Sequence, residues 1–273
     1  MPYTPYINII EKDILQYINS ITTETSLLDA MKYACLAGGK RIRPQLMFAS
    51  AEINDIDFDD IRPLALALEL IHSYSLIHDD LPAMDNSTLR RGKPTVHKVF
   101  GEGIAILAGD ALLNCAMEIL FAAAVNKPFL TKAAQMLAKK AGISGMIGGQ
   151  ALDISLTMQN AQGATVELMS ALKTGALIEY ALSAPCLVPH QLPSYADFAS
   201  LGQKIGLLFQ ITDDLLDLSE EENEVTLASF YGIDWCKEQI ETLEKECKDI
   251  LQKYQEKGAK LAKIVHKLAN RSI

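Results

Sequence analysis

Apolar side chains recur along most of the chain at a spacing near the 3.6-residue period of an α-helix. Short signals of Gly, Pro and Asn interrupt this pattern, and the segments between them do not alternate as strands do. The stretch 64–70 has leucine at every second position, but alanine fills the gaps and the apolar pattern continues at helical spacing to residue 77. We therefore predict a buried helix over residues 61–80 and an all-α fold.

Start and stop signals predict the limits of further helices. Thr25 and Ser26 precede an apolar segment that ends at the pair Gly38-Gly39, as helices often do, and another helix begins near Arg41. The remaining helices are expected at 103–125, 128–141, 143–158, 165–183, 195–217 and 234–256.

The bulk composition suits one soluble globular domain over residues 1–273, because nothing demands a second core and no repeat or linker is evident. The basic, amphipathic segment 256–273 is interpreted as a C-terminal helix that packs on the core and exposes its lysines to solvent. A role at a membrane surface is the alternative. The formal net charge of -9 argues against nucleic-acid binding, which needs a basic face. An anionic substrate would therefore need local positive charge.

The cysteines indicate a reduced, cytoplasmic chain, because they are five in number and form neither a C-x-x-C pair nor zinc-type spacing. The first residues lack the basic and apolar regions of a secretion signal. Segment 103–125 is long enough to span a membrane, but Asp110 and Glu118 in its interior would be costly in lipid. We expect a buried soluble helix there and no stable membrane insertion.

Segment 209–217, FQITDDLLD, concentrates acidic residues within a predicted helix. Helical geometry places Gln210, Asp213, Asp214 and Asp217 on one stripe, because three or four residues separate neighbours. Like charges in this arrangement repel one another, which suggests a bound cation that neutralises them. A polar face that merely meets water is the alternative for this segment taken alone.

A first acidic cluster, Asp79, Asp80 and Asp85, lies earlier in the chain, within HDDLPAMD. In a regular helix, at about 100° per residue, Asp85 would lie well off the face of Asp79. Pro82 cannot donate to the helix ladder, so the helix must break or bulge here. A distorted end would let Asp85 return towards Asp79 and provide the oxygen ligands that Mg²⁺ prefers.

Basic residues lie on both sides of this first cluster in the sequence. Gly39, Lys40 and Arg43 precede it in GGKRIRP, and Arg90 and Arg91 follow it. Arginine forks match phosphate oxygens, and glycine permits close backbone approach, although each basic segment alone is equally consistent with a solvated loop. No Ser, Cys or His dyad is evident, so the combination describes a site that binds diphosphate and stabilises it as a leaving group.

Taken together, the motifs resemble those of the trans-isoprenyl diphosphate synthases, or polyprenyl synthetases, most nearly the bacterial farnesyl and geranyl diphosphate synthases (geranyltranstransferases). They span nearly the whole chain in the family's order: AGGKRIRP at 37–44, ELIHSYSLIHDDLPAMDNSTLRRGKPTVH at 69–97, AILAGDALL at 105–113, GGQALD at 148–153, LKTGAL at 172–177 and FQITDDLLD at 209–217. The resemblance implies the all-α isoprenoid synthase fold, a single-domain helical bundle of about ten or more helices around a deep central cavity. It also implies a homodimer with segment 103–125 at the interface.

The resemblance further implies a role for each matching residue. Three Mg²⁺ ions, with substrate bound, would be held by Asp79, Asp80, Asp85, Asp213, Asp214 and Asp217. Isopentenyl diphosphate would lie among Gly39, Lys40, Arg43, His72 and Arg91. The allylic diphosphate would contact Arg90, Lys173, Thr174 and Gln210. The last three of these would be catalytic residues along the path of the developing carbocation.

The implied reaction is the head-to-tail condensation of isopentenyl diphosphate with dimethylallyl or geranyl diphosphate, with the released diphosphate as the base. Product length in this family depends on the residues one turn before the first aspartate cluster, where bulky side chains close the tunnel. Tyr74 and Ser75 occupy these positions, and an aromatic side chain here resembles the synthases that stop at fifteen carbons. We therefore expect farnesyl diphosphate as the main product.

The chain departs from the family pattern after Asp217. A lysine- and glycine-containing loop that closes over the diphosphates is expected there, but no lysine occurs between Lys204 and Lys237. Two explanations stay open: a segment missing from this sequence, or a true deletion. A true deletion would weaken allylic diphosphate binding and favour a non-catalytic or regulatory subunit of the same fold, although the intact aspartate and arginine clusters argue against that function.

Two further classes compete with the synthase interpretation. A head-to-head condensing enzyme or a terpene cyclase would share the helices and aspartates, but would not explain the basic segments GGKRIRP and RRGKPTVH. A helical interaction protein without a catalytic site would use the apolar segment 103–125 to bind a partner.

Overall fold

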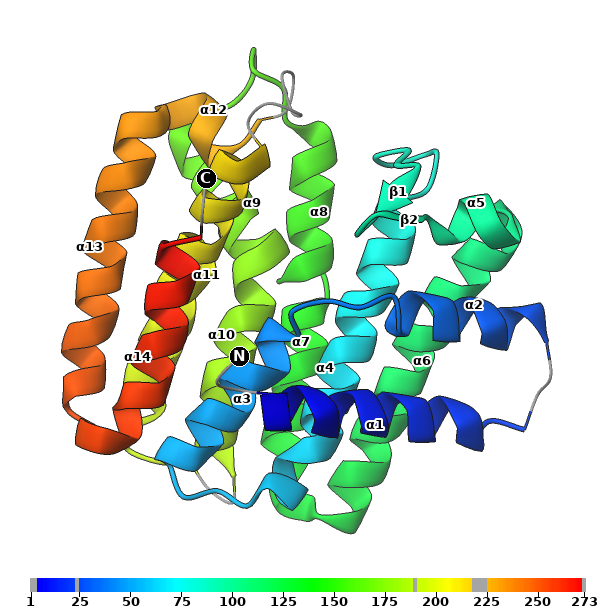
Figure 1. Ribbon diagram of the computed structural model, residues 1–273, viewed down its shortest axis with the longest axis horizontal. Helices are drawn as coiled ribbons and strands as arrows, with labels where there is room; N and C mark the ends of the chain where they lie inside the picture. The colour runs from blue at the N-terminus through cyan, green and yellow to red at the C-terminus, as the bar shows by residue number, and fades with distance from the viewer. Residues whose placement is uncertain (1–3, 23–24, 189–190, 218–224, 272–273) are drawn as a thin grey trace. The chain divides into compact units, whose positions relative to one another are not determined.

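The computed structural model describes residues 4–22, 25–188, 191–217 and 225–271, and it is helical almost throughout (Figure 1). The all-α prediction is confirmed: in these described ranges the only strands are the short antiparallel pair β1 (Leu89–Arg90) and β2 (Lys93–Pro94). Contacts within the chain divide it into two compact units, described separately below. Unit 1 comprises Met1–Phe48 and Phe58–Ala134, and unit 2 comprises Ala49–Asp57 and Gln135–Ile273. The expectation of a single domain stays a prediction.

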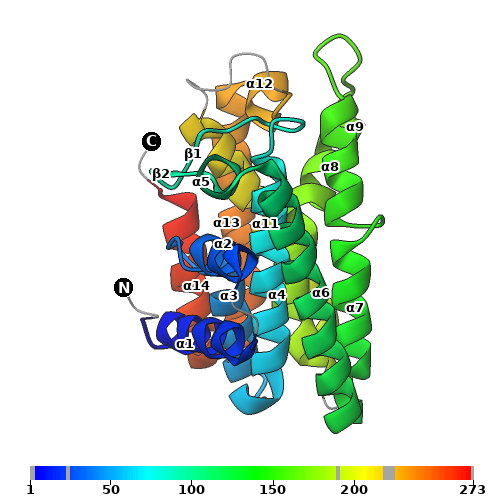
Figure 2. The ribbon, with the colours of Figure 1, turned by 90° about the vertical axis from the view of Figure 1, so that its right-hand side faces the viewer.

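Unit 1 is built around a long central helix, α4, against which α6 packs along its length (Figures 1 and 2). Its elements are α1 (Thr4–Ser20), α2 (Ser26–Cys35), α4 (Phe58–Asp79), α5 (Val96–Phe100), α6 (Glu102–Asn126) and a 3₁₀ turn (Pro128–Leu130). Helix α3 (Ile42–Ile53) and helix α7 (Thr131–Ala141) have residues in both units. The predicted helices 61–80 and 103–125 therefore exist within about three residues of their expected limits.

The middle of α4 is buried on every side, which explains its ambiguous sequence pattern. Leu64, Ala65, Ala67 and Leu68 have no exposed surface, and Leu66 is 9% exposed. A helix that is apolar all round belongs to a core, and its pattern has no clear period. Sequence reasoning missed α1, although three fully buried isoleucines at four-residue spacing mark its inner face: Ile10, Ile14 and Ile18.

Unit 2 contains a layer in which α11, α13 and α14 pack side by side (Figure 1). Its elements after α7 are α8 (Met146–Ser155), α9 (Gly163–Ser170), a π-helical turn η2 (Ala171–Gly175), α10 (Ala176–Ser183), a 3₁₀ turn (Ala184–Leu187), α11 (Tyr195–Asp217), α12 (Leu227–Tyr231), α13 (Ile233–Gln252) and α14 (Gln255–Ala269). The predicted limits of α11 are confirmed. The predicted helix over 234–256 instead ends at Gln252, before α14 begins.

The expected single helix over 165–183 is wrong in one respect, because the π-turn η2 interrupts it. Glycines explain the tight packing around this turn. A Cβ added at Gly149 of α8 would lie 2.1 Å from the backbone nitrogen of Lys173, and one at Gly206 of α11 would lie 2.8 Å from Cα of Gly175. The turn is therefore held between two helices that approach it at backbone distance, and π-turns of this kind often occur at functional sites.

Candidate active site

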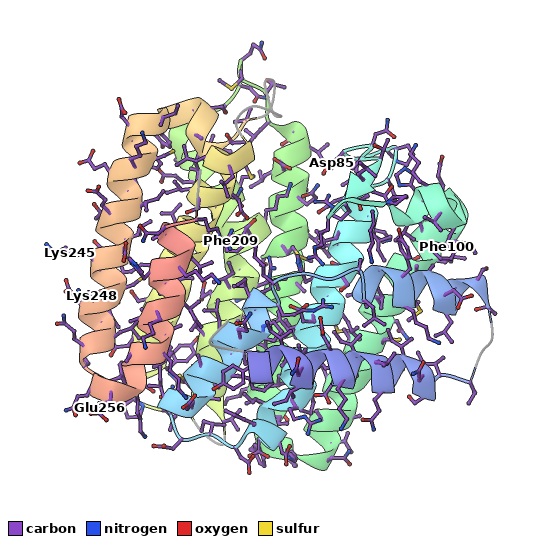
Figure 3. All side chains as sticks on the ribbon, in the orientation of Figure 1. Asp85, Phe100, Phe209, Lys245, Lys248 and Glu256 are labelled. Carbon is purple, nitrogen blue, oxygen red and sulfur yellow. The ribbon has the colours of Figure 1, made fainter. Side chains whose placement is uncertain are left out.

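The first aspartate cluster lies at a broken helix end, as the sequence predicts. Helix α4 ends at Asp79, and the chain then turns: the backbone N–H of Leu81 donates to the carbonyl of His78 at 3.1 Å. The backbone N–H of Asp85 donates to the carbonyl of Asp79 at 2.9 Å. Asp85 therefore returns to the end of α4, beside the β1–β2 hairpin (Figure 3), and the predicted distortion is confirmed at the level of the backbone.

Asp80 is held by an arginine of the same site. Its carboxylate is 3% exposed, and Oδ1 accepts hydrogen bonds from Nε of Arg90 at 3.0 Å and from Nη2 at 2.6 Å. Burial lowers the pKa of the Arg90 guanidinium, but the carboxylate of Asp80, with those of Asp79 and Asp85, outweighs this effect and raises it. Asp80 thus orients Arg90.

Arg91, at the turn of the hairpin, joins the hairpin to the glycine-rich segment. Its Nη1 donates to the carbonyl of Gly38. A Cβ added at Gly39 would lie 2.6 Å from Nη1 of Arg91, and Gly39 has φ of +137°, so no other residue fits there without displacing the arginine. Gly39 therefore permits a close approach by the guanidinium of Arg91, whereas the expected approach of a phosphate to this glycine stays a prediction.

Positive charge gathers around His72 of α4. Loss of solvating water lowers the pKa of this imidazole well below its usual value, and four arginines lower it further: Arg43, Arg91, Arg41 and Arg90, in order of effect. A small cavity of about 30 Å³ opens among His72, Arg41, Arg90 and Arg91. It holds no more than a water molecule or two, but it marks where the basic side chains of unit 1 converge. Such a concentration of guanidinium groups is suited to a multiply charged anion.

The predicted chain-length residues lie on α4, in the last turns before Asp79. Tyr74 is 5% exposed, and its hydroxyl has no hydrogen-bond partner among the residues that the structure describes. Burial and the nearby Asp79 carboxylate raise the pKa of this hydroxyl to about 12. The ring meets His78 edge-on, with centroids 5.8 Å apart. Ser75 donates to the carbonyl of His72 at 3.0 Å, so its hydroxyl is satisfied within the helix.

The second aspartate cluster lies within an unbroken helix, α11. Asp214 is 4% exposed; Oδ1 accepts from Nε2 of Gln210 at 2.6 Å, and Oδ2 accepts from the backbone N–H of Leu227 at 2.8 Å. The predicted shared stripe of Gln210 and Asp214 is thereby confirmed. Leu227 is the first residue of α12, so Asp214 also anchors the start of that helix. The side chain of Asp217 and residues 218–224, where the lysine- and glycine-containing loop was expected to begin, lie outside the described part of the chain.

Asp213 has a partner that sequence reasoning missed. Nη1 of Arg271, just beyond α14, donates to Oδ1 of Asp213 at 2.5 Å. The guanidinium also lies over the ring of Phe209, 4.4 Å from its centroid, where α11 passes the end of α14 (Figure 3). The two residues are 58 positions apart in sequence, and no local pattern links them.

Lys173 and Thr174 lie in the π-turn η2, which packs against α8 and α11. Nζ of Lys173 donates to Oδ2 of Asp153 at 2.5 Å, and Thr174 is half-buried beside it. Asp153 is the last residue of the GGQALD motif and was not predicted as a site residue. The ion pair shows that this motif holds the lysine of the LKTGAL motif in place.

The carboxylates suit Mg²⁺ by their chemistry. Among the described residues no group of three or more His, Cys, Asp or Glu side chains is arranged to hold a metal ion. Mg²⁺ does not need such a cage, because it keeps several waters and binds through one or two carboxylates together with substrate phosphates. Asp79, Asp85 and Asp213 supply hard oxygen ligands of this kind. Asp80 and Asp214 are the buried members of the two clusters and accept hydrogen bonds from Arg90 and from Gln210 and Leu227, while the more exposed Asp213 is paired with Arg271.

Comparison with known proteins shows which family, relatives and solved structures this chain is similar to. The model of the polyprenyl synthetase family matches residues 24–268. A geranylgeranyl diphosphate synthase from Cyanophora paradoxa is 39% identical over 267 residues, with 91% of this chain and 88% of that protein covered. A farnesyl diphosphate synthase from Geobacillus stearothermophilus is 40% identical over 223 residues, with 79% and 74% covered. The crystal structure of a geranyltransferase from Legionella pneumophila superposes with a TM-score of 0.91 at 35% identity, covering 98% of this chain and 95% of that one.

Proposed function

Because the chain belongs to the polyprenyl synthetase family, as the motifs in its sequence suggested, we propose that it condenses isopentenyl diphosphate with an allylic diphosphate, head to tail, and releases diphosphate. Its fold is the all-α isoprenoid synthase fold, and its enzyme class is that of the prenyltransferases. The observation that carries the specific reaction is the cavity that His72 shares with Arg90 and Arg91, next to the carboxylate-bearing end of α4.

The proposed substrates divide the basic residues between them. Isopentenyl diphosphate binds among Gly39, Lys40, Arg43, His72 and Arg91, which include the interlocked Gly39 and Arg91. The allylic diphosphate contacts Arg90, which Asp80 orients, and also Lys173, Thr174 and Gln210. Prenyl diphosphate synthases use such substrates, and no feature of this chain's charge favours nucleic acid.

We assign the metal to the carboxylates. The family is in general dependent on divalent metals, and for this chain we propose three Mg²⁺ ions held by Asp79, Asp85 and Asp213, with Asp217 as a further candidate. When bound, the metal neutralises charge on the departing diphosphate. Asp80 and Asp214, predicted from the sequence as ligands, act in this proposal by positioning Arg90 and Gln210.

In the reaction, the bond between the allylic carbon and its diphosphate oxygen breaks, and the electron pair leaves with the diphosphate. Arg90 stabilises the negative charge that develops there. The double bond of isopentenyl diphosphate attacks the allylic cation, forming a carbon–carbon bond and a new cation. A proton then passes to the released diphosphate, which regenerates a double bond. In this proposal the side-chain oxygens of Thr174 and Gln210 stabilise the positive charge that develops along this path.

The main product is proposed to be farnesyl diphosphate. The relatives named above include both a farnesyl and a geranylgeranyl diphosphate synthase, so the product rests on Tyr74. Its ring is buried on α4, five residues before Asp79, which supports a role in stopping the growing chain. In Tyr74→Ala we expect products of twenty carbons or more, whereas Tyr74→Phe, which keeps the ring, should give the parent product. A Tyr74→Ala protein that makes no longer product would contradict this assignment.

The test of the overall function is a product assay. The purified chain, incubated with isopentenyl diphosphate, geranyl diphosphate and Mg²⁺, should give a product of fifteen carbons, measured by chromatography after phosphatase treatment. Folded protein without any product would contradict the proposal and favour the non-catalytic or regulatory subunit. That outcome is the relevant alternative, because the sequence after Asp217 lacks the lysine-containing loop.

We also propose a homodimer formed through α6. This is the one helix among the described residues that is long and apolar enough to cross a membrane, and 39% of its most apolar window is buried. Its exposed apolar side chains are Ile106, Leu107, Phe121 and Val125. A second copy would cover them without burying Asp110 and Glu118 in lipid. A monomeric hydrodynamic size at micromolar concentration would contradict the dimer.

A reducing compartment, the cytoplasm, is proposed as the location. All five cysteines are buried and none is in a disulfide: Cys35, Cys115, Cys186, Cys236 and Cys247. Burial raises the pKa of each of these thiols, which keeps them protonated and slow to oxidise.

A further inference from the structure

Arg41 lies between Lys40 and Arg43 in sequence, but its side chain is more deeply buried than either of theirs. Lys40 is exposed and Arg43 half-buried, whereas Arg41 is 5% exposed. Its Nη1 donates to Oε2 of Glu69 at 3.1 Å, and its Nη2 donates to the carbonyl of Cys35 at 2.6 Å. Glu69 is itself only 2% exposed, on α4. Arg41 therefore points into the protein and forms a buried ion pair.

The backbone of residues 38–41 adopts a conformation that is unfavourable unless other contacts stabilise it. Gly38 and Gly39 have φ of +89° and +137°, and Arg41 has φ of +47°. The left-handed region is unfavourable for a residue with a Cβ and is kept only where neighbouring contacts hold it. Here the side chain of Arg41, the residue immediately before α3, provides those contacts.

Two further side chains hold the same loop. Nε2 of Gln45 donates to the carbonyl of Lys40, and Nη1 of Arg91 donates to the carbonyl of Gly38. Both contacts hold backbone carbonyls of the loop. The loop is thus fastened at Gly38, Lys40 and Arg41, and the Arg41 contact is the one that reaches α4.

A buried ion pair contributes little to stability in itself, because desolvation of the two charges offsets their attraction. Replacing such a pair by apolar side chains of similar size is often neutral or stabilising. An ion pair in this place is better explained by the position that it imposes on the loop. Glu69 lies on the same helix as His72, so the pair fixes the loop relative to the histidine of the pocket.

We propose that Arg41 and Glu69 are positioning residues for isopentenyl diphosphate: their buried ion pair holds loop 38–41 in the conformation that presents Lys40 and Arg43 to the diphosphate. This inference deepens, and rests on, the proposed function. Neither residue touches the substrate in this proposal. Their loss should therefore weaken binding of one substrate and leave the chemical step intact.

The test is the double variant Arg41→Met with Glu69→Leu, which removes both charges together and avoids an unpaired buried ion. We expect the KM for isopentenyl diphosphate to rise about ten- to a hundredfold, as for a binding group displaced by about 1 Å. The KM for geranyl diphosphate and kcat should stay within about twofold, and the melting temperature should fall only slightly, because the two charges leave together while the carbonyl of Cys35 loses its donor. Calorimetry with isopentenyl diphosphate alone should show the same loss of affinity without turnover.

The matched control is another ion pair of unit 1, between Arg62 and Asp13. Their atoms are 2.9 Å (Nε to Oδ2) and 2.5 Å (Nη2 to Oδ1) apart. The variant Arg62→Gln with Asp13→Asn should leave the KM for isopentenyl diphosphate unchanged. An equal rise in KM in this control, or a rise for both substrates in the test variant, would overturn the inference by showing a general loosening.

A second variant keeps the test decisive if the double variant folds poorly. Arg41→Lys retains a charge beside Glu69 but loses the nitrogen that reaches the carbonyl of Cys35, and we expect a smaller, still selective rise in KM. A KM equal to that of the parent in both variants overturns the inference while the proposed function stands. Absence of turnover and of isopentenyl diphosphate binding in the parent chain would instead overturn the proposed function.

Discussion

The two aspartate clusters reach a similar arrangement on different backbones. The first lies where α4 ends and the chain turns back on itself, whereas the second lies within the regular helix α11. In both, the second aspartate is the buried one: Asp80 is 3% exposed and Asp214 is 4% exposed. Asp80 binds Arg90, and Asp214 binds Gln210 and the start of α12.

The difference between the clusters teaches that the shared pattern DD serves two purposes. In each pair, the second aspartate accepts hydrogen bonds within the protein and stabilises the fold. The first aspartate is more exposed; the side chain of Asp213, for example, is 34% exposed. The clusters also differ in where they place an arginine: Arg90 holds the buried member of the first, and Arg271 holds the more exposed member of the second. Each part of this comparison has a measurable consequence.

The largest effect is expected from the more exposed aspartates. In Asp79→Ala and in Asp213→Ala, kcat should fall by about a hundred- to a thousandfold, the loss typical of removing one group that stabilises developing charge. The measurement is steady-state turnover with isopentenyl and geranyl diphosphates, with helix content checked by circular dichroism. A folded variant with near-parent kcat would remove that residue from the metal-binding set.

The buried aspartates should instead affect stability. Asp214→Ala leaves the N–H of Leu227 and the amide of Gln210 without their acceptor, and should lower the free energy of unfolding by about 2–4 kcal/mol. Asp80→Ala should cost less, because its partner Arg90 is 37% exposed and water can replace the carboxylate. Chemical denaturation of both variants beside Asp79→Ala measures the difference. An equal loss of unfolding free energy in all three variants would contradict the inference that one aspartate of each pair stabilises the fold while its neighbour binds metal.

The sequence predicts much of this arrangement, for reasons that the residues make plain. Amphipathic periodicity and the spacing of Gln210 and Asp214 depend only on local geometry, so the helix α11 and its stripe were predictable. The break after Asp79 was predictable too, because Pro82 cannot continue the hydrogen-bond ladder. The division between exposed and buried aspartates was not, since nothing local distinguishes Asp79 from Asp80.

Contacts between distant residues lay beyond sequence reasoning. Arg41 looks like any other basic residue of GGKRIRP, and only its contact with Glu69, 28 positions away, shows that it is buried. The π-turn at Lys173 arises because Gly149 and Gly206 let two helices approach it closely. These features depend on tertiary packing, which overrides the continuous helical pattern of residues 165–183.

A smaller effect should follow from the arginine that distinguishes the second cluster. Arg271 occupies Oδ1 of Asp213, so a metal ion at that oxygen competes with an internal cation. In Arg271→Gln we expect the Mg²⁺ concentration for half-maximal activity to fall about threefold, since this change corresponds to losing an attraction of about 0.6 kcal/mol, within the range typical of a partly exposed pair. Lys267→Gln, an exposed charge on α14, should not change it. A higher Mg²⁺ requirement in Arg271→Gln alone would contradict competition.

The smallest effect tests whether the first cluster depends on Pro82. Alanine at this position restores a backbone N–H that can extend α4, which would carry Asp85 away from the carbonyl of Asp79. Opposing this, the N–H groups of Met84 and Asn86 both donate to the carbonyl of Leu81 and keep the turn closed. We therefore expect Pro82→Ala to change the free energy of unfolding by no more than about 1 kcal/mol.

In Pro82→Ala the Mg²⁺ concentration for half-maximal activity should rise, because Asp85 spends less time beside Asp79, and a Mg²⁺ titration of turnover measures this. An unchanged Mg²⁺ concentration for half-maximal activity would mean that the backbone hydrogen bonds alone, and not the proline, bring Asp85 back to the end of α4.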